Sequence, residues 1–193
     1  MSVSKTSKVN SRITRIAACL VAAAAVIVLC LLFVVPFAKY SIAKSLLRKE
    51  QYEQAVEMLV SLDDYKDSRK ILSEVLFQHT EYMEDGMTLE FGQFEGEPIE
   101  WFVISTEDDG VCLLSRYVLT SLPFDSDQDT DEWEDCSLRE WLNGEFYNDS
   151  FTEEERSRIS EGEDHVFLLD QSLVDQLPDD ISVGTNRSGV PYY

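Results

Sequence analysis

The chain is poor in the residues from which catalytic and metal sites are most often built. It holds two histidines, His79 and His165, and four cysteines in 193 residues, and no two cysteines form a C-x-x-C pair. A zinc site of the usual ligand spacing cannot be assembled from this set. No G-x-S-x-G, P-loop or dinucleotide-binding fingerprint occurs either. These absences predict a protein that is not an enzyme and that holds no cofactor.

Basic residues are scarce after the first quarter of the chain. Eight of the sixteen Lys and Arg residues lie in residues 1–49, which contain no acidic residue, whereas all 37 acidic residues lie in residues 50–193. A segment this acidic is not expected to bind nucleic acid, because phosphate contacts need a positive surface. Such a charge split between segments indicates that the two parts have different surroundings.

Charge is missing altogether from residues 16–38, which read IAACLVAAAAVIVLCLLFVVPFA. A helix of this length is about 34 Å long and crosses the roughly 30 Å hydrocarbon core of a bilayer. We therefore predict a transmembrane helix at residues 16–38, in contact with the lipid bilayer and preceded by a basic tail at residues 1–15. The alternative is a cleaved signal peptide ending near Ala43. The apolar region of a signal peptide is shorter, at roughly 7–15 residues.

The flanking charges bear on orientation. The basic tail favours a cytoplasmic N-terminus by the positive-inside rule, while the basic residues between Lys39 and Lys49 argue for the reverse. Long segments are translocated largely regardless of their charge. We expect a single-pass protein of the cell membrane, with its N-terminus cytoplasmic and its acidic domain extracellular.

Residues 41–80 carry the periodicity of helices with one apolar face. The segment DDYKDS at residues 63–68 interrupts the pattern, and Asp67 or Ser68 is a candidate cap for the helix that follows. The sequence QYEQAVEMLVSLDDYKDSRKI resembles a tetratricopeptide-type helical repeat. It covers about one unit, whereas such repeats need about three to stand alone. We expect a helical hairpin neck that packs on the next domain, with a peptide-binding groove as the alternative.

From residue 86 the sequence pattern changes to that of short strands separated by turns. Residues 88–94, 99–104 and 111–118 are expected to form an antiparallel meander, with turns at residues 96–98 and 107–110. Two capping boxes, Ser137 with Glu140 and Thr152 with Glu155, predict two short helices. A strand at residues 165–169 and a helix at residues 170–177 are expected to follow. The fold class predicted for residues 86–193 is a small α+β domain.

Several phrases in this region resemble an uncharacterised bacterial domain, DUF6273. They are FGQFEGEPIEWFVI, VCLLSRYVL, WEDCSLREWLNGEFYNDSFTEEERSRI and HVFLL, within residues 86–177. The most specific phrase reads W-x-x-C-x-L-R-x-W-L-N-x-x-F at residues 133–146. The resemblance implies an α+β domain, related to the C-type-lectin-like and formylglycine-generating-enzyme folds, whose members mostly bind ligands. The glycine-rich part expected after HVFLL is missing, so we expect the domain to be C-terminally truncated.

The roles of several individual residues can be interpreted in more than one way. Cys112 and Cys136 either form a disulfide or are two buried thiols. The loop at residues 125–132 has D-x-D-x-D spacing, but it lacks the glycine and the bidentate glutamate of an EF-hand, so no structural metal is expected. Cys136 could be a reactive thiol at a helix start, although packing is the favoured role. Arg139 is expected to bridge to the acidic loop, and the three tryptophans (Trp101, Trp133 and Trp141) are expected in the core.

These observations favour a membrane-anchored, non-catalytic extracytoplasmic binding or interaction protein of a bacterium, with a protein or carbohydrate ligand. One alternative is a structural stalk or signalling adaptor that acts through its helical neck. The other is an enzyme related to formylglycine-generating proteins, against which the lack of paired active cysteines argues.

Overall fold

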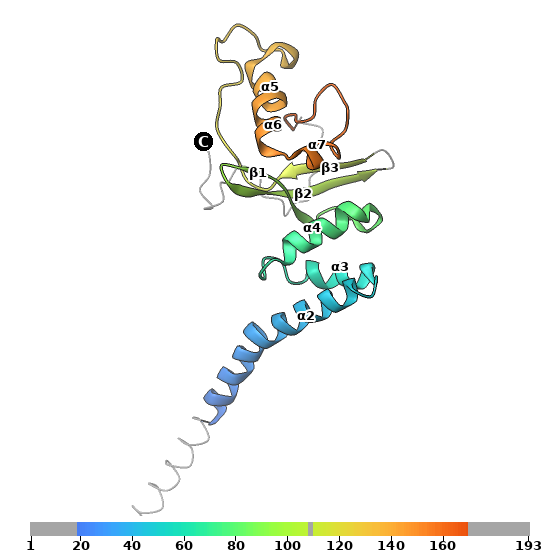
Figure 1. Ribbon diagram of the computed structural model, residues 1–193. Helices are drawn as coiled ribbons and strands as arrows, with labels where there is room; N and C mark the ends of the chain where they lie inside the picture. The colour runs from blue at the N-terminus through green and yellow to red at the C-terminus, as the bar shows by residue number, and fades with distance from the viewer. Residues whose placement is uncertain (1–18, 108–109, 170–193) are drawn as a thin grey trace, which may run out of the picture. The chain divides into compact units, whose positions relative to one another are not determined.

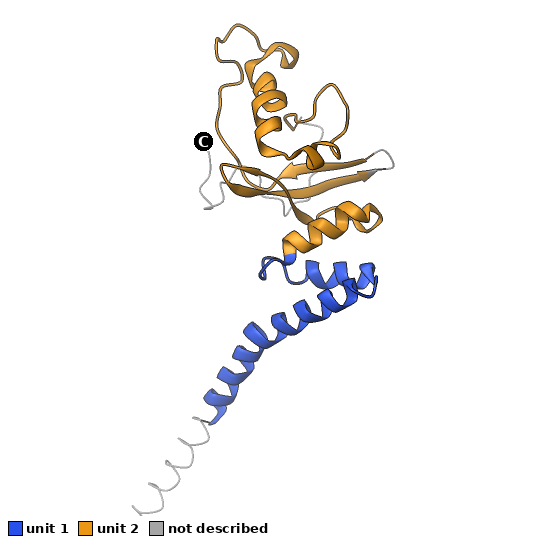
Figure 2. Cartoon of the chain, in the orientation of Figure 1, with its two compact units in different colours: residues 1–68 blue, residues 69–193 orange. Residues whose placement is uncertain are grey.

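The computed structural model describes residues 19–107 and 110–169. The chain divides into two compact units, residues 1–68 and residues 69–193 (Figure 2). The predicted α+β class is confirmed, with a long apolar helix, shorter helices and one three-stranded antiparallel sheet. The expected helix at residues 170–177 lies outside the described residues.

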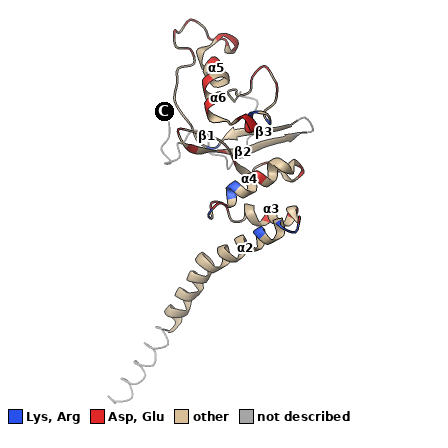
Figure 3. Ribbon diagram, in the orientation of Figure 1, with Lys and Arg blue, Asp and Glu red and all other residues tan. Residues whose placement is uncertain are grey.

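Unit 1 is dominated by one helix, Cys19–Leu47, which is long and apolar enough to cross a membrane. Its apolar part carries no charged residue before Lys39 (Figure 3). Within it, a π-helical turn, η1 (Cys30–Val34), precedes α2 (Val35–Leu47), and the N–H of Val35 donates to the carbonyl of Cys30. Pro36 explains this turn, because proline lacks an N–H and crowds the carbonyl four residues earlier. The helix continues to Leu47, beyond residue 38, where the predicted transmembrane segment ends.

The second helix of unit 1 is α3 (Tyr52–Val60), which contacts α2. The connection turns sharply at Glu50, whose φ is +58°. Ala43 in α2 and Ala55 and Leu59 in α3 are fully buried. The two alanines allow the helix backbones to approach closely. Unit 1 therefore contains a helical hairpin whose first arm is the end of the apolar helix.

Unit 2 begins at the second residue of α4 (Ser68–Gln78), which is followed by the 3-10 turn η2 (Thr80–Tyr82) and then by the sheet. The strands β1 (Thr88–Phe94), β2 (Glu97–Glu107) and β3 (Gly110–Ser115) pair in sequence order and antiparallel, as predicted. The first turn lies at Glu95 and Gly96 rather than at residues 96–98. Both residues have positive φ, +53° and +84°, as a type I′ hairpin turn requires.

A nearly continuous helical run follows the acidic loop. It comprises η3 (Trp133–Asp135), α5 (Ser137–Trp141), the π-helical turn η4 (Leu142–Phe146) and α6 (Tyr147–Ser150); α7 (Glu153–Arg156) comes after a short break. Figure 1 shows α4 on one side of the sheet and α5 and α6 on the other. The sheet is therefore the middle of three layers in unit 2.

On its α4 side, the sheet is held by a buried ion cluster. The Glu100 carboxylate in β2 pairs with Arg69 from α4 and lies 3.0 Å from Nη1 of Arg116, which follows β3. The exposed fractions of the Arg69 and Glu100 side chains are 4% and 6%. Removing one partner of such a pair leaves an uncompensated buried charge, which costs about 3–5 kcal/mol. In addition, Ser73 in α4 accepts a hydrogen bond from the N–H of Glu90 at 2.7 Å.

The helical run packs on the sheet through aromatic side chains. Phe151 is 3% exposed, and its ring centre lies 5.2 Å from that of Phe91 and 6.3 Å from that of Trp101. Of the three tryptophans expected in the core, Trp101 is buried, whereas Trp133 and Trp141 are partly exposed. Phe94 and Phe146 flank Trp141, with ring centres 6.4 and 5.3 Å from it.

Two local predictions are wrong and one is confirmed. The N-cap of α5 is Cys136, whose Sγ accepts from the Arg139 N–H, because the hydroxyl of Ser137 instead accepts from the Ser126 N–H at 2.8 Å. The Thr152–Glu155 capping box is present. Residues 165–169 are irregular rather than a strand, because the first two N–H groups bind a side chain instead of a neighbouring strand. Cys112 and Cys136 are not joined by a disulfide.

Gly92 generates a prediction. It lies in a bulge of β1 with φ of +72°, and a Cβ added there would come within 2.5 Å of the Phe151 ring and 2.8 Å of the Ser150 carbonyl. Gly96 has a similar φ, but nothing lies within 4 Å of its added Cβ. Both alanine variants carry the strain of a left-handed residue, and only Gly92→Ala adds overpacking, which costs about 1–3 kcal/mol.

All three tryptophans lie in unit 2, so tryptophan fluorescence of the full chain in detergent follows the unfolding of this unit. In urea titrations, Gly92→Ala should lower the free energy of unfolding by more than Gly96→Ala does. Equal losses in the two variants would mean that the bulge does not press against Phe151.

Candidate ligand-binding site

A cavity of about 880 Å³ lies beside β3 in unit 2. Side chains from all three strands, from the end of α4 and from the chain after α7 contribute to its wall. Its apolar lining includes Phe77, Phe91, Trp101, Ile104, Leu114 and Phe151. Ligand pockets in proteins commonly measure about 300–1,000 Å³ and are mostly apolar, so both the size and the lining suit a small ligand or a short segment of a larger one.

The aromatic part of the wall is held in place by packing and by one hydrogen bond. The rings of Phe77 and Phe91 lie 4.8 Å apart, and Phe151 extends the row. Trp101 Nε1–H donates to the carbonyl of Phe91 at 2.7 Å. Its polar group is thereby satisfied inside the fold, which leaves the ring as an apolar surface.

Three ionisable side chains on the cavity wall are already engaged in the fold. Arg158 donates to the Phe77 carbonyl at 3.1 Å and to the Glu154 carboxylate at 3.0 Å. His165 stacks on Tyr147 at 4.3 Å between ring centres, and its Nδ1 lies 2.9 Å from the Ser160 carbonyl. The third, Asp164, belongs to a larger group of contacts.

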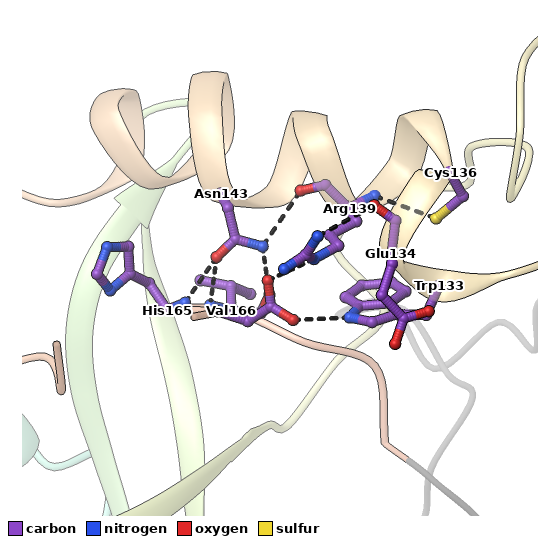
Figure 4. A network of polar contacts seen from close by, with 8 residues as sticks. Trp133, Glu134, Cys136, Arg139, Asn143, His165 and Val166 are labelled. Atoms are coloured by element: carbon purple, nitrogen blue, oxygen red, sulfur yellow. Dashed lines mark hydrogen bonds and ion pairs between the residues drawn. The ribbon is translucent and has the colours of Figure 1, made fainter. Parts of the chain in front are cut away.

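That group, which we call the Asp164 network, connects the helical run to residues 164–166 (Figure 4). Trp133 Nε1–H donates to one carboxylate oxygen of Asp164 at 2.7 Å, and Arg139 Nε–H donates to the other at 2.6 Å. Arg139 also donates to the Glu134 carbonyl at 3.0 Å. The prediction that Arg139 bridges to the acidic loop is therefore wrong: its partners are Asp164 and the backbone of η3.

Asn143 is the second connection in the network. Its Oδ1 accepts from the N–H groups of His165 and Val166 at 2.6 and 3.0 Å, while its Nδ2 donates to the carbonyls of Val166 and Arg139 at 2.9 and 3.2 Å. These four bonds use the full capacity of the side-chain amide. Asn143 thus gives an irregular segment the hydrogen bonds that a neighbouring strand would otherwise supply.

The charges of the network favour an ion pair at neutral pH. Burial opposes ionisation of Asp164, but the hydrogen bonds from Trp133 and Arg139 outweigh it and lower the pKa of the carboxyl. The hydrogen bond to Asp164 in turn raises the pKa of Arg139. Because the folded-state pKa of Asp164 is depressed, its contribution to stability is present at neutral pH. It is lost as the pH falls through that pKa.

The acidic loop has a structural role at the start of α5. The Asp125 carboxylate accepts from the Asp129 N–H at 2.9 Å and from the Ser137 N–H at 3.2 Å, and these two contacts lower the pKa of Asp125. Within residues 19–107 and 110–169, no group of three or more His, Cys, Asp or Glu residues is placed to hold a metal ion. The absence of a structural metal in this loop stays a prediction.

The two other residues considered for chemistry lie apart from each other. Cys136 is 2% exposed at the N-terminus of α5, consistent with the favoured packing role. His79 follows α4, and its Nδ1 lies 3.3 Å from the Glu81 carboxylate. The cavity and the network bring together residues that sequence reasoning did not connect, above all Asp164 with Trp133 and Asn143 with Val166. The available signal was the presence of polar residues within the motif at residues 133–146.

The Asn143 amide generates a prediction. Asn143→Asp keeps the shape but removes both donors and places a carboxylate against the carbonyls of Arg139 and Val166. Leaving buried polar groups unsatisfied costs about 1–3 kcal/mol, and more when a charge is involved. Asn148→Asp is the matched control, because Asn148 is exposed on α6 and its side-chain amide donates one hydrogen bond, to the Gly144 carbonyl.

In urea titrations at neutral pH, Asn143→Asp should destabilise unit 2 clearly more than Asn148→Asp does. Lowering the pH toward 4 should reduce the difference, because a protonated carboxyl regains one donor. A difference that is absent, or that does not depend on pH, would contradict the assigned role of the amide.

Comparison with known proteins gives one family match. Residues 108–172 match the family described as "Domain of unknown function (DUF6273)". No curated protein and no solved structure matches the chain. The match is narrower than the expected range of residues 86–177, since it begins after β2, but it contains the whole Asp164 network. The expected lectin-like fold and the tetratricopeptide-like segment stay predictions. The chain therefore carries a DUF6273 domain of unknown function at residues 108–172.

Proposed function

We propose that the protein is a membrane-anchored, non-catalytic binding protein of a bacterium, and that unit 2, which contains the DUF6273 match, binds a ligand outside the cytoplasm. The observation on which the binding role depends is the aromatic-lined cavity of about 880 Å³. The anchoring role depends on the apolar helix, and the two roles are tested separately.

The exposed surface of the helix supports anchoring. Its large aliphatic and aromatic side chains, from Leu20 to Phe37, are 40–70% exposed, and none of the most apolar stretch is buried in the protein. The helix Cys19–Leu47 is about 43 Å long, which exceeds the roughly 30 Å hydrocarbon core. A bilayer would cover this apolar surface, and the end of the helix would project from it.

The state of the polar groups near the cavity supports binding rather than catalysis. Asp164 and Arg158 each hold a partner within the fold. The hydrogen bonds from Trp133 and Arg139 lower the pKa of Asp164, and an arginine stays protonated in proteins. Neither group is therefore suited to exchange a proton with a ligand near neutral pH.

The chemistry of the lining favours a protein ligand over a carbohydrate. Sugars are usually held by polar side chains together with an exposed aromatic face, whereas Trp101 is 9% exposed and its N–H is occupied. Apolar side chains from a partner protein would replace water over the partly exposed lining residues Phe77, Ile104 and Leu114. This exchange is favourable by about 25 cal/mol for each Å² of apolar surface buried.

A protease test addresses the anchoring and its orientation. Protease added to intact bacterial cells that produce the full chain should digest unit 2, and the basic tail should be digested only after lysis. A tag at each end of the chain, detected by immunoblot, reports the two outcomes. Protection of unit 2 in intact cells, with digestion after lysis, would reverse the proposed orientation.

A cross-linking test addresses the cavity. The photoreactive amino acid p-benzoylphenylalanine is placed at Leu114, which lines the cavity, or at Leu122, which is 44% exposed and does not line it. Illumination of cells should give a discrete cross-linked product for position 114 and none for position 122. Products at both positions, or at neither, would count against the cavity as the binding site.

A further inference from the structure

A cluster of aromatic rings around one lysine lies in unit 1, where the apolar part of the long helix ends. Phe37 and Tyr40 belong to α2, whereas Tyr65 and Lys66 lie in the turn after α3, residues 61–67. Lys66 Nζ lies over all three rings, 5.0 Å from the centre of Phe37, 4.8 Å from that of Tyr40 and 5.3 Å from that of Tyr65.

Helix lengths explain why two segments so distant in sequence meet. α3 has nine residues, which rise about 13 Å. The part of α2 after the apolar run, Lys39–Leu47, has the same length. Because α3 runs back along this part of α2, its C-terminal end returns to the level of Lys39. The contact between Lys39 Nζ and the Ser61 hydroxyl, at 3.1 Å, lies at that level.

Further contacts hold the turn against the helix. The Tyr40 hydroxyl donates to the Asp67 carboxylate, and the rings of Tyr40 and Tyr65 meet edge to face with centres 6.0 Å apart. The turn contains two residues with left-handed backbone, Asp63 with φ of +47° and Lys66 with φ of +58°. Such a conformation is unfavourable for a lysine. The position of its ammonium over three rings is a contact that compensates for this.

The position of the cluster along the helix identifies its surroundings. Phe37 is the second-last residue of the uncharged run, and its side chain is 56% exposed. If the run crosses a bilayer, as in the proposed function, Phe37 and Tyr40 lie where the hydrocarbon core gives way to the headgroups. Tyrosine and lysine favour this layer, because each has an apolar body and a polar end.

We propose that Phe37, Tyr40, Tyr65 and Lys66 form one membrane-interface anchor, which holds the turn of residues 61–67 in the lipid headgroup layer. The inference rests on the membrane crossing of the proposed function. Three aspartates in the same turn (Asp63, Asp64 and Asp67) offset the charges of Lys39, Lys44 and Lys66. The attachment therefore depends on rings and lysine stems rather than on net positive charge, and it does not require anionic lipid.

The test measures the depth of the turn in the bilayer. The full chain is placed in phosphatidylcholine vesicles with a fluorescent amino acid at Asp64 in the turn or, as the matched control, at Glu53. Both positions are exposed acids, and Glu53 lies two helical turns before Ser61, about 12 Å farther from the bilayer. Lipid carrying a nitroxide on its headgroup should quench the probe at position 64 and leave the probe at position 53 bright.

A second pair of variants tests the role of the lysine. Lys66→Gln should weaken the quenching at position 64 while the helical circular dichroism signal is kept. Lys70→Gln, which changes an exposed lysine outside the cluster, should leave the quenching unchanged. Quenching at position 64 should also be the same in zwitterionic and anionic vesicles. A requirement for anionic lipid, or quenching unaffected by Lys66→Gln, would overturn the proposal.

A third probe separates this inference from the proposed function. A fluorescent amino acid at Val28, in the middle of the apolar run, should be quenched by lipid with a nitroxide on its acyl chain. If Val28 is quenched and position 64 is not, the interface anchor is wrong and the membrane crossing stands. If Val28 is not quenched, the helix does not cross the bilayer, and the membrane anchoring and the interface anchor both fail.

Discussion

Among the residues that the structure describes, no strand pairs with the cavity wall at residues 164–166, and side chains of the helical run supply its hydrogen bonds. Asn143 binds the backbone of this segment on both its donor and acceptor sides, and Asp164 anchors it through Trp133 and Arg139. An unpaired backbone group in a partly buried position is costly, so these contacts decide whether the segment stays in place. The network thus helps to hold this part of the cavity wall in place.

The same contacts explain what several residues of the region that matches DUF6273 do in the fold. The motif at residues 133–146 supplies Trp133, Arg139 and Asn143, and all three reach residues 164–166 within the matched region. Its apolar members serve a different purpose, since Phe146 packs against Phe94 and Phe151. The motif thus holds one loop and one sheet edge in position. None of the residues of this motif is among those that line the cavity.

Periodicity and turn chemistry were sufficient to predict the apolar helix, the three antiparallel strands and the Thr152 capping box, because each depends on neighbours in sequence. Contacts between distant residues were not predictable in this way. No feature of the sequence around Asn143 indicates that its side chain binds the backbone of Val166. An apolar run such as HVFLL is typical of a strand, and the sequence does not show that it has no strand to pair with among the described residues. Ser137 resembles a cap in sequence, but its hydroxyl is used by the backbone of Ser126. The cavity depends on three layers meeting and has no signature in any one segment.

The π-helical turn before Pro36 has a consequence for bilayers of different thickness. The uncharged run is about 34 Å long, slightly more than a typical hydrocarbon core of about 30 Å, and such helices take up the excess by tilting. The helix changes direction within its length (Figure 1), and η1 lies close to the end of the apolar part. A change in tilt of the embedded part can be absorbed at this irregular turn, where the hydrogen-bond pattern already departs from the α-helix. The residues after Pro36 can then keep a constant angle to the membrane surface as the bilayer becomes thinner or thicker.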